Sequence, residues 1–180
     1  MTRPPFVTVV IPARNEEAII TATLERVVGY LHTIEERYPW EIIVVDDGSG
    51  DRTGELIDGF AATEPRVRAF HHHVNFNLGQ ALRYAFNNAR GDYIVTLDAD
   101  LSYAPEHIGA LLEAAVKTGA KVVIASPYCK GGRTTAVPWM RRLLSRSSNA
   151  LLSLTAKGNL STLSGMVRCY DRPFIQALST

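Results

Sequence analysis

Two carboxylates, Asp98 and Asp100, follow directly after the apolar run Tyr-Ile-Val-Thr-Leu at residues 93–97. Side chains two positions apart on an extended chain point to the same face, so we expect both to emerge together from the end of a buried strand. Adjacent carboxylates stay ionised when a hard divalent cation binds them. Mg²⁺ takes one or two protein carboxylates and completes its shell with substrate phosphates. The pair therefore predicts a metal site that holds a diphosphate; the alternative is an ordinary solvated turn.

Short runs rich in Val and Ile alternate along the chain with helical patterns. The runs at 6–11, 41–45, 67–71, 92–97 and 122–126 predict strands. Apolar residues at steps of three and four predict helices around 20–34, 78–89 and 108–115, the last ending before Gly119. This order predicts an α/β fold in which a Rossmann-like, mostly parallel sheet has helices on both faces and ligands at the carboxyl ends of its strands.

Polar residues collect where that rule expects them, just after the first, second and fourth strands. They form the segments 12–17, 46–53 and 98–100. The chain has no GxGxxG after its first strand and no GxxxxGK[ST], which argues against a dinucleotide site and a P-loop. The polar segments after these strands instead predict an acidic, metal-dependent site.

Composition sets further limits. The chain has 180 residues, 46% hydrophobic and 21% charged, which suits one soluble globular domain. Residues 1–126 hold 11 Lys and Arg against 17 Asp and Glu, a net charge of −6, whereas residues 127–180 hold 8 against one, a net of +7. We therefore expect a donor-binding and metal-binding half at 1–126 and a basic acceptor half at 127–180. No membrane span or signal peptide is evident, so we expect a cytoplasmic protein. The scattered aromatic residues disfavour nucleic-acid binding.

Several motifs in order resemble the family 2 glycosyltransferases of the GT-A fold. They are VIPARNEE at 10–17, VDDGSGDRT at 45–53, NFNLGQA at 75–81 and DADLSYAP at 98–105. Within that family, the segment at 98–105 and the later segments SRSSN at 145–149 and GMVRCY at 165–170 resemble the polyprenyl-phosphate, dolichol-phosphate mannose synthase-like branch. Isolated turns would seldom reproduce this set of motifs in one order.

The resemblance implies roles for individual residues. Asp98 and Asp100 would hold Mg²⁺ or Mn²⁺ on the sugar-nucleotide diphosphate and act as the catalytic pair. Asp47 would read the base and ribose side of the nucleotide. The full set implied for the nucleotide sugar is Pro12, Arg14, Glu16, Val45, Asp47, Ala99 and Ser102. The donor would be GDP-mannose or UDP-glucose.

The resemblance also implies an inverting transfer of a hexose to a polyprenyl phosphate. Such an acceptor is already an anionic nucleophile, so it needs cations to position it rather than a general base. The candidates are Arg141, Arg142, Ser145 and Arg146, in a Trp- and Leu-bearing stretch at 138–155 that could lie at a membrane surface. We therefore expect peripheral contact with the cytosolic face of a membrane. An ordinary core-facing helix with a basic outer face is the alternative.

The chain departs from the branch pattern at several positions. Arg14 stands where Tyr is usual, Ser126-Pro127-Tyr128 replaces an Arg-containing Thr-Arg-Tyr, and Ser102 replaces a Gln. Relatives usually continue beyond the position of Thr180, so we expect a shortened chain. Two alternative functions stay open: transfer to a hydroxyl acceptor, or a catalytically incompetent nucleotide-binding or scaffold domain.

Overall fold

A computed structural model describes residues 3–126 and 165–179. The chain divides into two compact units, one made of Met1–Val123 with Val167–Thr180 and the other of Ile124–Met166. The first unit contains the sheet, its helices and the polar loops predicted to bind the donor. In the described ranges, no helix is long and apolar enough to cross a membrane.

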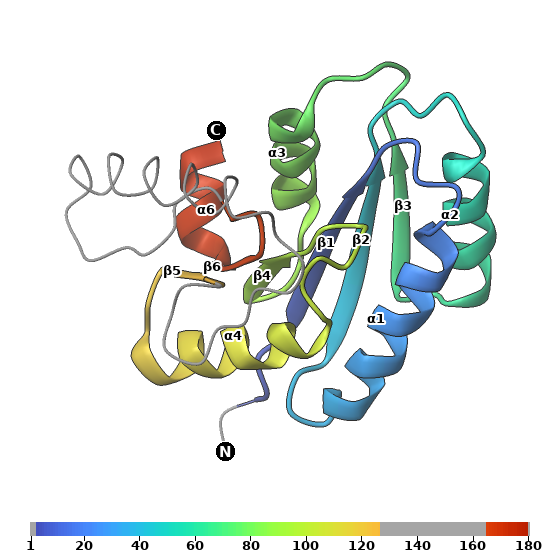
Figure 1. Cartoon of the computed structure of the whole chain (residues 1–180). Helices are drawn as coiled ribbons and strands as arrows, with labels where there is room; N and C mark the ends of the chain where they lie inside the picture. Colours follow the sequence, from blue (N-terminus) through green and yellow to red (C-terminus); the bar gives the residue numbers. More distant parts are fainter. Residues whose placement is uncertain (1–2, 127–164, 180) are drawn as a thin grey trace, which may run out of the picture. The chain divides into compact units, whose positions relative to one another are not determined.

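The first unit is built on a sheet with strand order β3-β2-β1-β4-β6-β5 (Figure 1). Its strands are β1 Val7–Ala13, β2 Trp40–Asp46, β3 Val67–His71, β4 Tyr93–Thr96, β5 Val122–Ile124 and β6 Arg168–Asp171. The pairs β1–β2, β1–β4 and β2–β3 are parallel, whereas β6 runs antiparallel to β4. The mostly parallel sheet is as predicted, but β6 was not anticipated.

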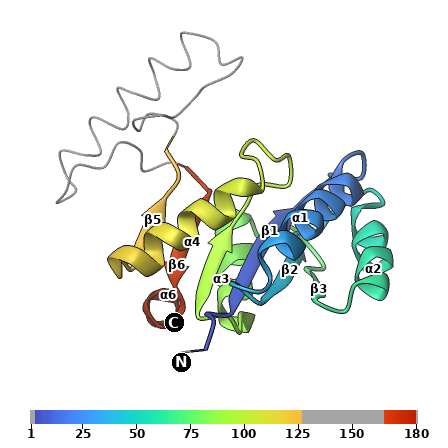
Figure 2. The same cartoon turned by 90° about the horizontal axis from the view of Figure 1, so that it is seen from below.

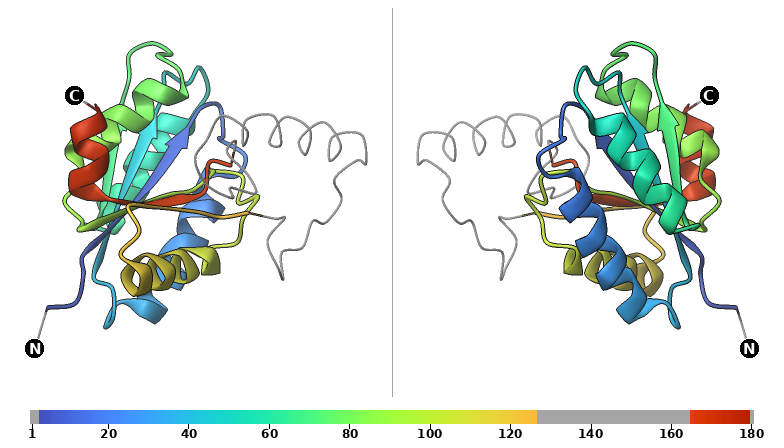
Figure 3. Two further views of the ribbon diagram at one scale, coloured as in Figure 1. Left: turned by 90° about the vertical axis from the view of Figure 1, so that its left-hand side faces the viewer. Right: turned by 90° about the vertical axis from the view of Figure 1, so that its right-hand side faces the viewer.

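Helices cover both faces of this sheet, as Figure 2 and Figure 3 show. They are α1 Ile20–Ile34, α2 Thr53–Thr63, α3 Leu78–Asn88, α4 Glu106–Thr118 and α6 Arg172–Ser179. α1, α2 and α4 lie on one face, and α3 and α6 lie on the other. Because both faces are covered, β1 and β2 are buried along almost their whole length.

The apolar stripes predicted for the helices are largely the ones that pack. On α3, Ala85 and Phe86 join a core cluster with β1, β2, β4 and β6. Leu78, which the pattern placed in that stripe, is instead 49% exposed because it begins the helix. α4 ends as predicted at Gly119, whose left-handed backbone (φ 66°) lets its N–H bond to the Ala115 carbonyl.

Candidate active site

The loops after β1 and β2 are joined to each other by reciprocal hydrogen bonds. The backbone N–H of Asn15 donates to Ser49 Oγ at 2.9 Å, and the backbone N–H of Gly50 donates to the side-chain oxygen Oδ1 of Asn15 at 2.8 Å. The same pattern links the Glu17 amide to Asp51 and the Arg52 amide to the Glu17 carboxylate. Neighbouring parallel strands end at the same edge of the sheet, so the two motifs form one platform at the carboxyl ends of β1 and β2.

Asp47 lies at the end of β2 and is almost completely buried. Its Oδ1 atom accepts hydrogen bonds from His72 Nδ1 at 2.7 Å and from the Phe76 amide at 2.9 Å. Burial alone would raise the pKa of Asp47, but these hydrogen bonds outweigh burial and hold the pKa below its ordinary value. Asp47 is therefore ionised and able to accept a hydrogen bond from a ligand N–H.

Gly48, next to Asp47, allows the β3–α3 loop to approach this platform. Its backbone is left-handed (φ 67°), and a Cβ atom placed there would lie 2.4 Å from the Val74 carbonyl carbon. Only glycine fits such a position without a shift of the backbone. The loops after β1, β2 and β3 therefore meet at one place.

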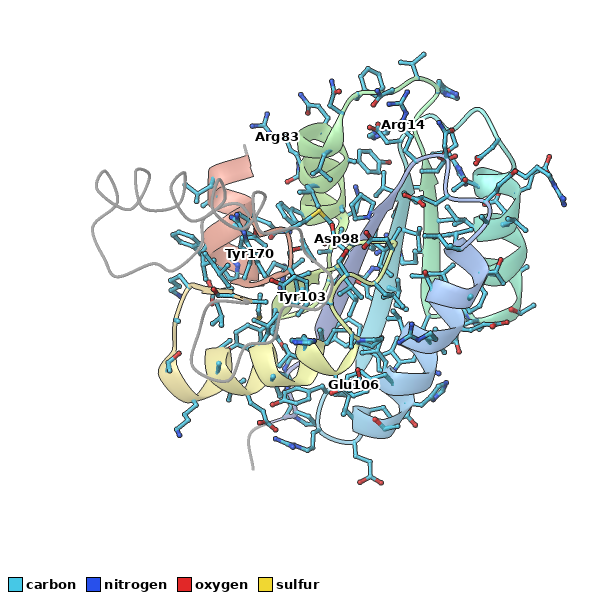
Figure 4. All side chains as sticks on the ribbon, in the orientation of Figure 1. Arg14, Arg83, Asp98, Tyr103, Glu106 and Tyr170 are labelled. Atoms are coloured by element: carbon cyan, nitrogen blue, oxygen red, sulfur yellow. The ribbon has the colours of Figure 1, made fainter. Side chains whose placement is uncertain are left out.

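Asp98 and Asp100 stand in a tight turn just beyond β4. The Leu97 amide still bonds to the Val10 carbonyl, which continues the β1–β4 pairing to the start of the turn. The carbonyl of the buried Ala99 accepts from Thr23 Oγ1 on α1 at 2.6 Å, which anchors the turn between the two aspartates. Figure 4 shows Asp98 in this turn and Arg14 in the loop after β1, both at the carboxyl end of the sheet.

Negative charge accumulates at this edge. Burial and the neighbouring Asp100 raise the pKa of Asp98. Burial also raises the pKa of Glu16, with Asp100 and Asp51 adding to the effect. Like charges held close together are stabilised by a cation. The donor set of carboxylate oxygens suits Mg²⁺ or Mn²⁺, so Asp98 and Asp100 fit a divalent metal. Over the described ranges no three His, Cys, Asp or Glu side chains make a fuller metal site.

The remaining predicted residues differ in where the structure places them. Pro12 faces Val45 across the β1–β2 pairing, but the Val45 side chain lies in the core cluster, which leaves only its backbone for a ligand. Arg14 is exposed. Ser102 donates from both its amide and its hydroxyl to Asp100, each at 2.8 Å, and so fixes that carboxylate. The predicted acceptor-phosphate residues Arg141, Arg142, Ser145 and Arg146 lie outside the described residues.

Sequence reasoning assigned no role to several side chains that join the predicted motifs to other segments. His72, Thr23, Asn15 and Ser49 each bond to a predicted motif from another segment. The sequence contained one usable signal: pairing β2 with β3 in parallel places an Asp-Asp pair beside a His-His pair. The strand predicted at 67–71 ends at the first of three consecutive histidines, and His71 does end β3.

Comparison with known sequences identifies relatives of the whole chain. A sequence profile described as glycosyl transferase family 2 matches residues 8–178. An undecaprenyl-phosphate 4-deoxy-4-formamido-L-arabinose transferase from Edwardsiella ictaluri is 37% identical over 175 residues, covering 96% of this chain and 51% of that protein. A polyprenol monophosphomannose synthase from Mycolicibacterium smegmatis is 34% identical over 174 residues, covering 94% and 63%. The chain spans about half the length of the first curated relatives it matches.

Solved structures show the same fold. A mannosyltransferase from Pyrobaculum calidifontis in complex with GDP-Man and Mn²⁺ superposes with a TM-score of 0.68 at 22% identity, covering 98% of this chain and 47% of that one. Glucosyl-3-phosphoglycerate synthase from Mycobacterium tuberculosis in complex with UDP gives a TM-score of 0.65 at 24% identity, covering 94% and 57%. The predicted GT-A fold is confirmed.

Proposed function

The chain belongs to glycosyl transferase family 2, and from this we propose that it carries the donor site of an inverting enzyme. The enzyme moves a hexose, mannose or glucose, from a nucleotide-diphosphate sugar to a polyprenyl phosphate. One observation carries the proposal: the buried, ionised Asp47 and the Asp98–Asp100 turn stand at the same edge of the sheet. The names of the curated relatives, which include undecaprenyl-phosphate and polyprenol transferases, support the acceptor class.

The predicted side chains at this edge are suited to binding different parts of a nucleotide sugar. Asp47 accepts from an N–H of the base, and Arg14 provides an exposed cation beside the phosphates. Asp98 and Asp100 would hold Mg²⁺ or Mn²⁺, and Ser102 fixes the Asp100 carboxylate by two hydrogen bonds. Such an ion would supply positive charge to neutralise the negative charge that develops on the leaving diphosphate.

The position of the late acidic residue supports an acceptor that is already anionic. Downstream of Glu113 the sequence has one carboxylate, Asp171. Asp171 pairs with Tyr93 at the amino end of β4, the opposite end of that strand from Asp98, and its carboxylate contacts Lys121 Nζ at 3.2 Å. It is therefore badly placed to deprotonate a hydroxyl acceptor. A polyprenyl phosphate needs no such base.

A transfer assay tests the reaction directly. Nucleotide sugars with Mg²⁺ or Mn²⁺ are offered a short-chain polyprenyl phosphate or a simple sugar acceptor. We expect product on the polyprenyl phosphate. Product on the sugar hydroxyl alone would favour the hydroxyl-acceptor alternative, and nucleotide binding without any product would favour the binding-domain alternative.

The metal role is tested by changing both aspartates, Asp98→Asn and Asp100→Asn. Loss of both charges should abolish metal-dependent binding of the nucleotide sugar, measured by calorimetry with and without Mn²⁺, because the hard cation loses its charged ligands. Glu106→Gln, an exposed change on α4, is the matched control and should bind normally. Unchanged metal-dependent affinity in the double variant would contradict the assignment.

A further inference from the structure

Two adjacent histidines at the end of β3 lie beside two adjacent aspartates at the end of β2. The parallel register places His71 opposite Asp46. Successive side chains on a strand point to opposite faces, so the next pair, His72 and Asp47, meets on the other side. His71 bridges Asp46 and Asp58 toward α2, whereas His72 contacts Asp47 toward α3. Each histidine therefore contacts one of the two adjacent aspartates of the VDDGSGDRT motif.

The His72 ring is fixed on several sides. Its side chain is 11% exposed, and its Nδ1 lies 2.7 Å from Asp47 Oδ1. The rings of Phe76 and Tyr84 contact it edge-on, with centroids at 5.1 Å and 5.5 Å. These contacts restrict rotation of the His72 ring, so its Nδ1–H points toward Asp47.

The Asp47 carboxylate oxygen determines which nitrogen of the His72 ring carries the proton. An ionised carboxylate is only an acceptor, so His72 Nδ1 must be the donor. The Phe76 amide donates to the same Oδ1 atom at 2.9 Å. Two donors from the β3–α3 segment on one oxygen fix the plane of the Asp47 carboxylate before any ligand arrives.

We propose that His72 is a positioning residue for nucleotide recognition, holding the Asp47 carboxylate in the orientation that accepts an N–H of the donor base. The inference rests on the proposed role of Asp47 as the base-reading residue. A fixed carboxylate loses less rotational freedom on binding than a free one, so the contribution of His72 appears in affinity for the base. The diphosphate, held at Asp98 and Asp100, is bound independently of His72.

The test compares ligands that have a base with one that has none. Affinities for UDP, GDP and inorganic pyrophosphate, each with Mn²⁺, are measured by calorimetry for the chain and its variants. His72→Ala should weaken binding of the preferred nucleoside diphosphate about tenfold, as expected for loss of a hydrogen bond to a charged group. Pyrophosphate affinity should stay the same. His72→Asn, which can place an N–H near the Nδ1 position, should restore most of the loss.

His73→Ala is the matched control, because His73 is exposed and its side chain makes no hydrogen bond or ion pair within the described residues. It should bind every ligand normally. In an Asp47→Ala background, His72→Ala should have no further effect, because the two residues act through one carboxylate.

The outcomes separate this inference from the proposed function. If Asp47→Ala weakens nucleotide binding but His72→Ala does not, the His72 inference is overturned and the role of Asp47 stands. If Asp47→Ala leaves nucleotide affinity unchanged, base reading by Asp47 fails and the His72 role fails with it. Equal weakening of pyrophosphate and nucleotide in His72→Ala would indicate a general structural role and overturn the inference.

Discussion

Asp98 is half-buried beside Asp100, and its pKa is raised first by burial and then by the neighbouring charge. Ionised Asp98 therefore opposes folding, since both effects disfavour its charge in the native state more than in the unfolded chain. A ligand-binding site commonly carries such a cost in stability.

Asp98→Asn should for this reason raise the thermal midpoint of the metal-free chain at neutral pH, because it removes a disfavoured charge at nearly constant volume. Scanning calorimetry in the presence of a chelator measures the effect. Added Mn²⁺ should stabilise the original chain by mass action and leave the variant unchanged. A lower midpoint for metal-free Asp98→Asn would show that the charge itself stabilises the turn.

Single residues of the site differed in how well the sequence could identify them. Asp98 and Asp100 could be proposed from the sequence because two carboxylates after an apolar strand have a chemical meaning by themselves; their role as metal ligands stays a prediction. His72 and Thr23 could not be proposed, because each acts through a contact across segments far apart in the chain. Such a contact depends on strand register and helix placement, which local pattern does not specify.

At the scale of elements, strands and helices with strong apolar periodicity were predicted and confirmed. β3 has the predicted bounds, and β1 and β2 differ from prediction by one or two residues at each end. β6 was missed because its four residues, Arg168–Asp171, include no Val or Ile and insert antiparallel beside β4. The sequence also did not indicate the role of α2, which is to place Asp58 within hydrogen-bond distance of His71.

The His71 bridge joins β3, β2 and α2, and its strength should depend on pH. Burial lowers the pKa of His71, but hydrogen bonds with Asp58 and Asp46 outweigh burial and raise it above the ordinary value. A raised pKa means that the bridge stabilises the fold fully below the ordinary histidine pKa of about 6.5 and loses this contribution as pH rises through the folded value.

We therefore expect His71→Gln to lower the free energy of unfolding more at pH 5.5 than at pH 8.5. Urea denaturation at the two pH values measures the difference, with His73→Gln as the exposed control from the same segment. A destabilisation of equal size at both pH values would show that the charge of His71 does not contribute. Because the side chain is 36% exposed, solvent screens part of the effect.

At the scale of the whole molecule, the sequence combines an acidic first part with a basic segment after residue 126. The residues proposed to bind the metal and the nucleotide belong to the acidic part, where a bound cation would offset their charge. The proposed acceptor phosphate must then be met by cations from elsewhere in the chain. We propose that Arg141, Arg142 and Arg146 supply them, from a stretch at 138–155 in which they are interleaved with Trp139 and several leucines. The relatives that suggest a lipid acceptor are about twice as long as this chain, so further contacts with the lipid belong to the proposal for the whole enzyme.

Changing Arg141, Arg142 and Arg146 together to Gln tests this division of charge. Attraction to an anionic surface is worth about 1 kcal/mol for each nearby Lys or Arg and is screened by salt. The triple variant should therefore bind anionic liposomes more weakly at low salt and need more polyprenyl phosphate for half-maximal transfer. Its affinity for the nucleotide sugar should stay nearly constant, because the donor residues lie on the loops after β1, β2 and β4. Equal liposome binding and equal acceptor dependence would instead support a basic helix face exposed only to solvent.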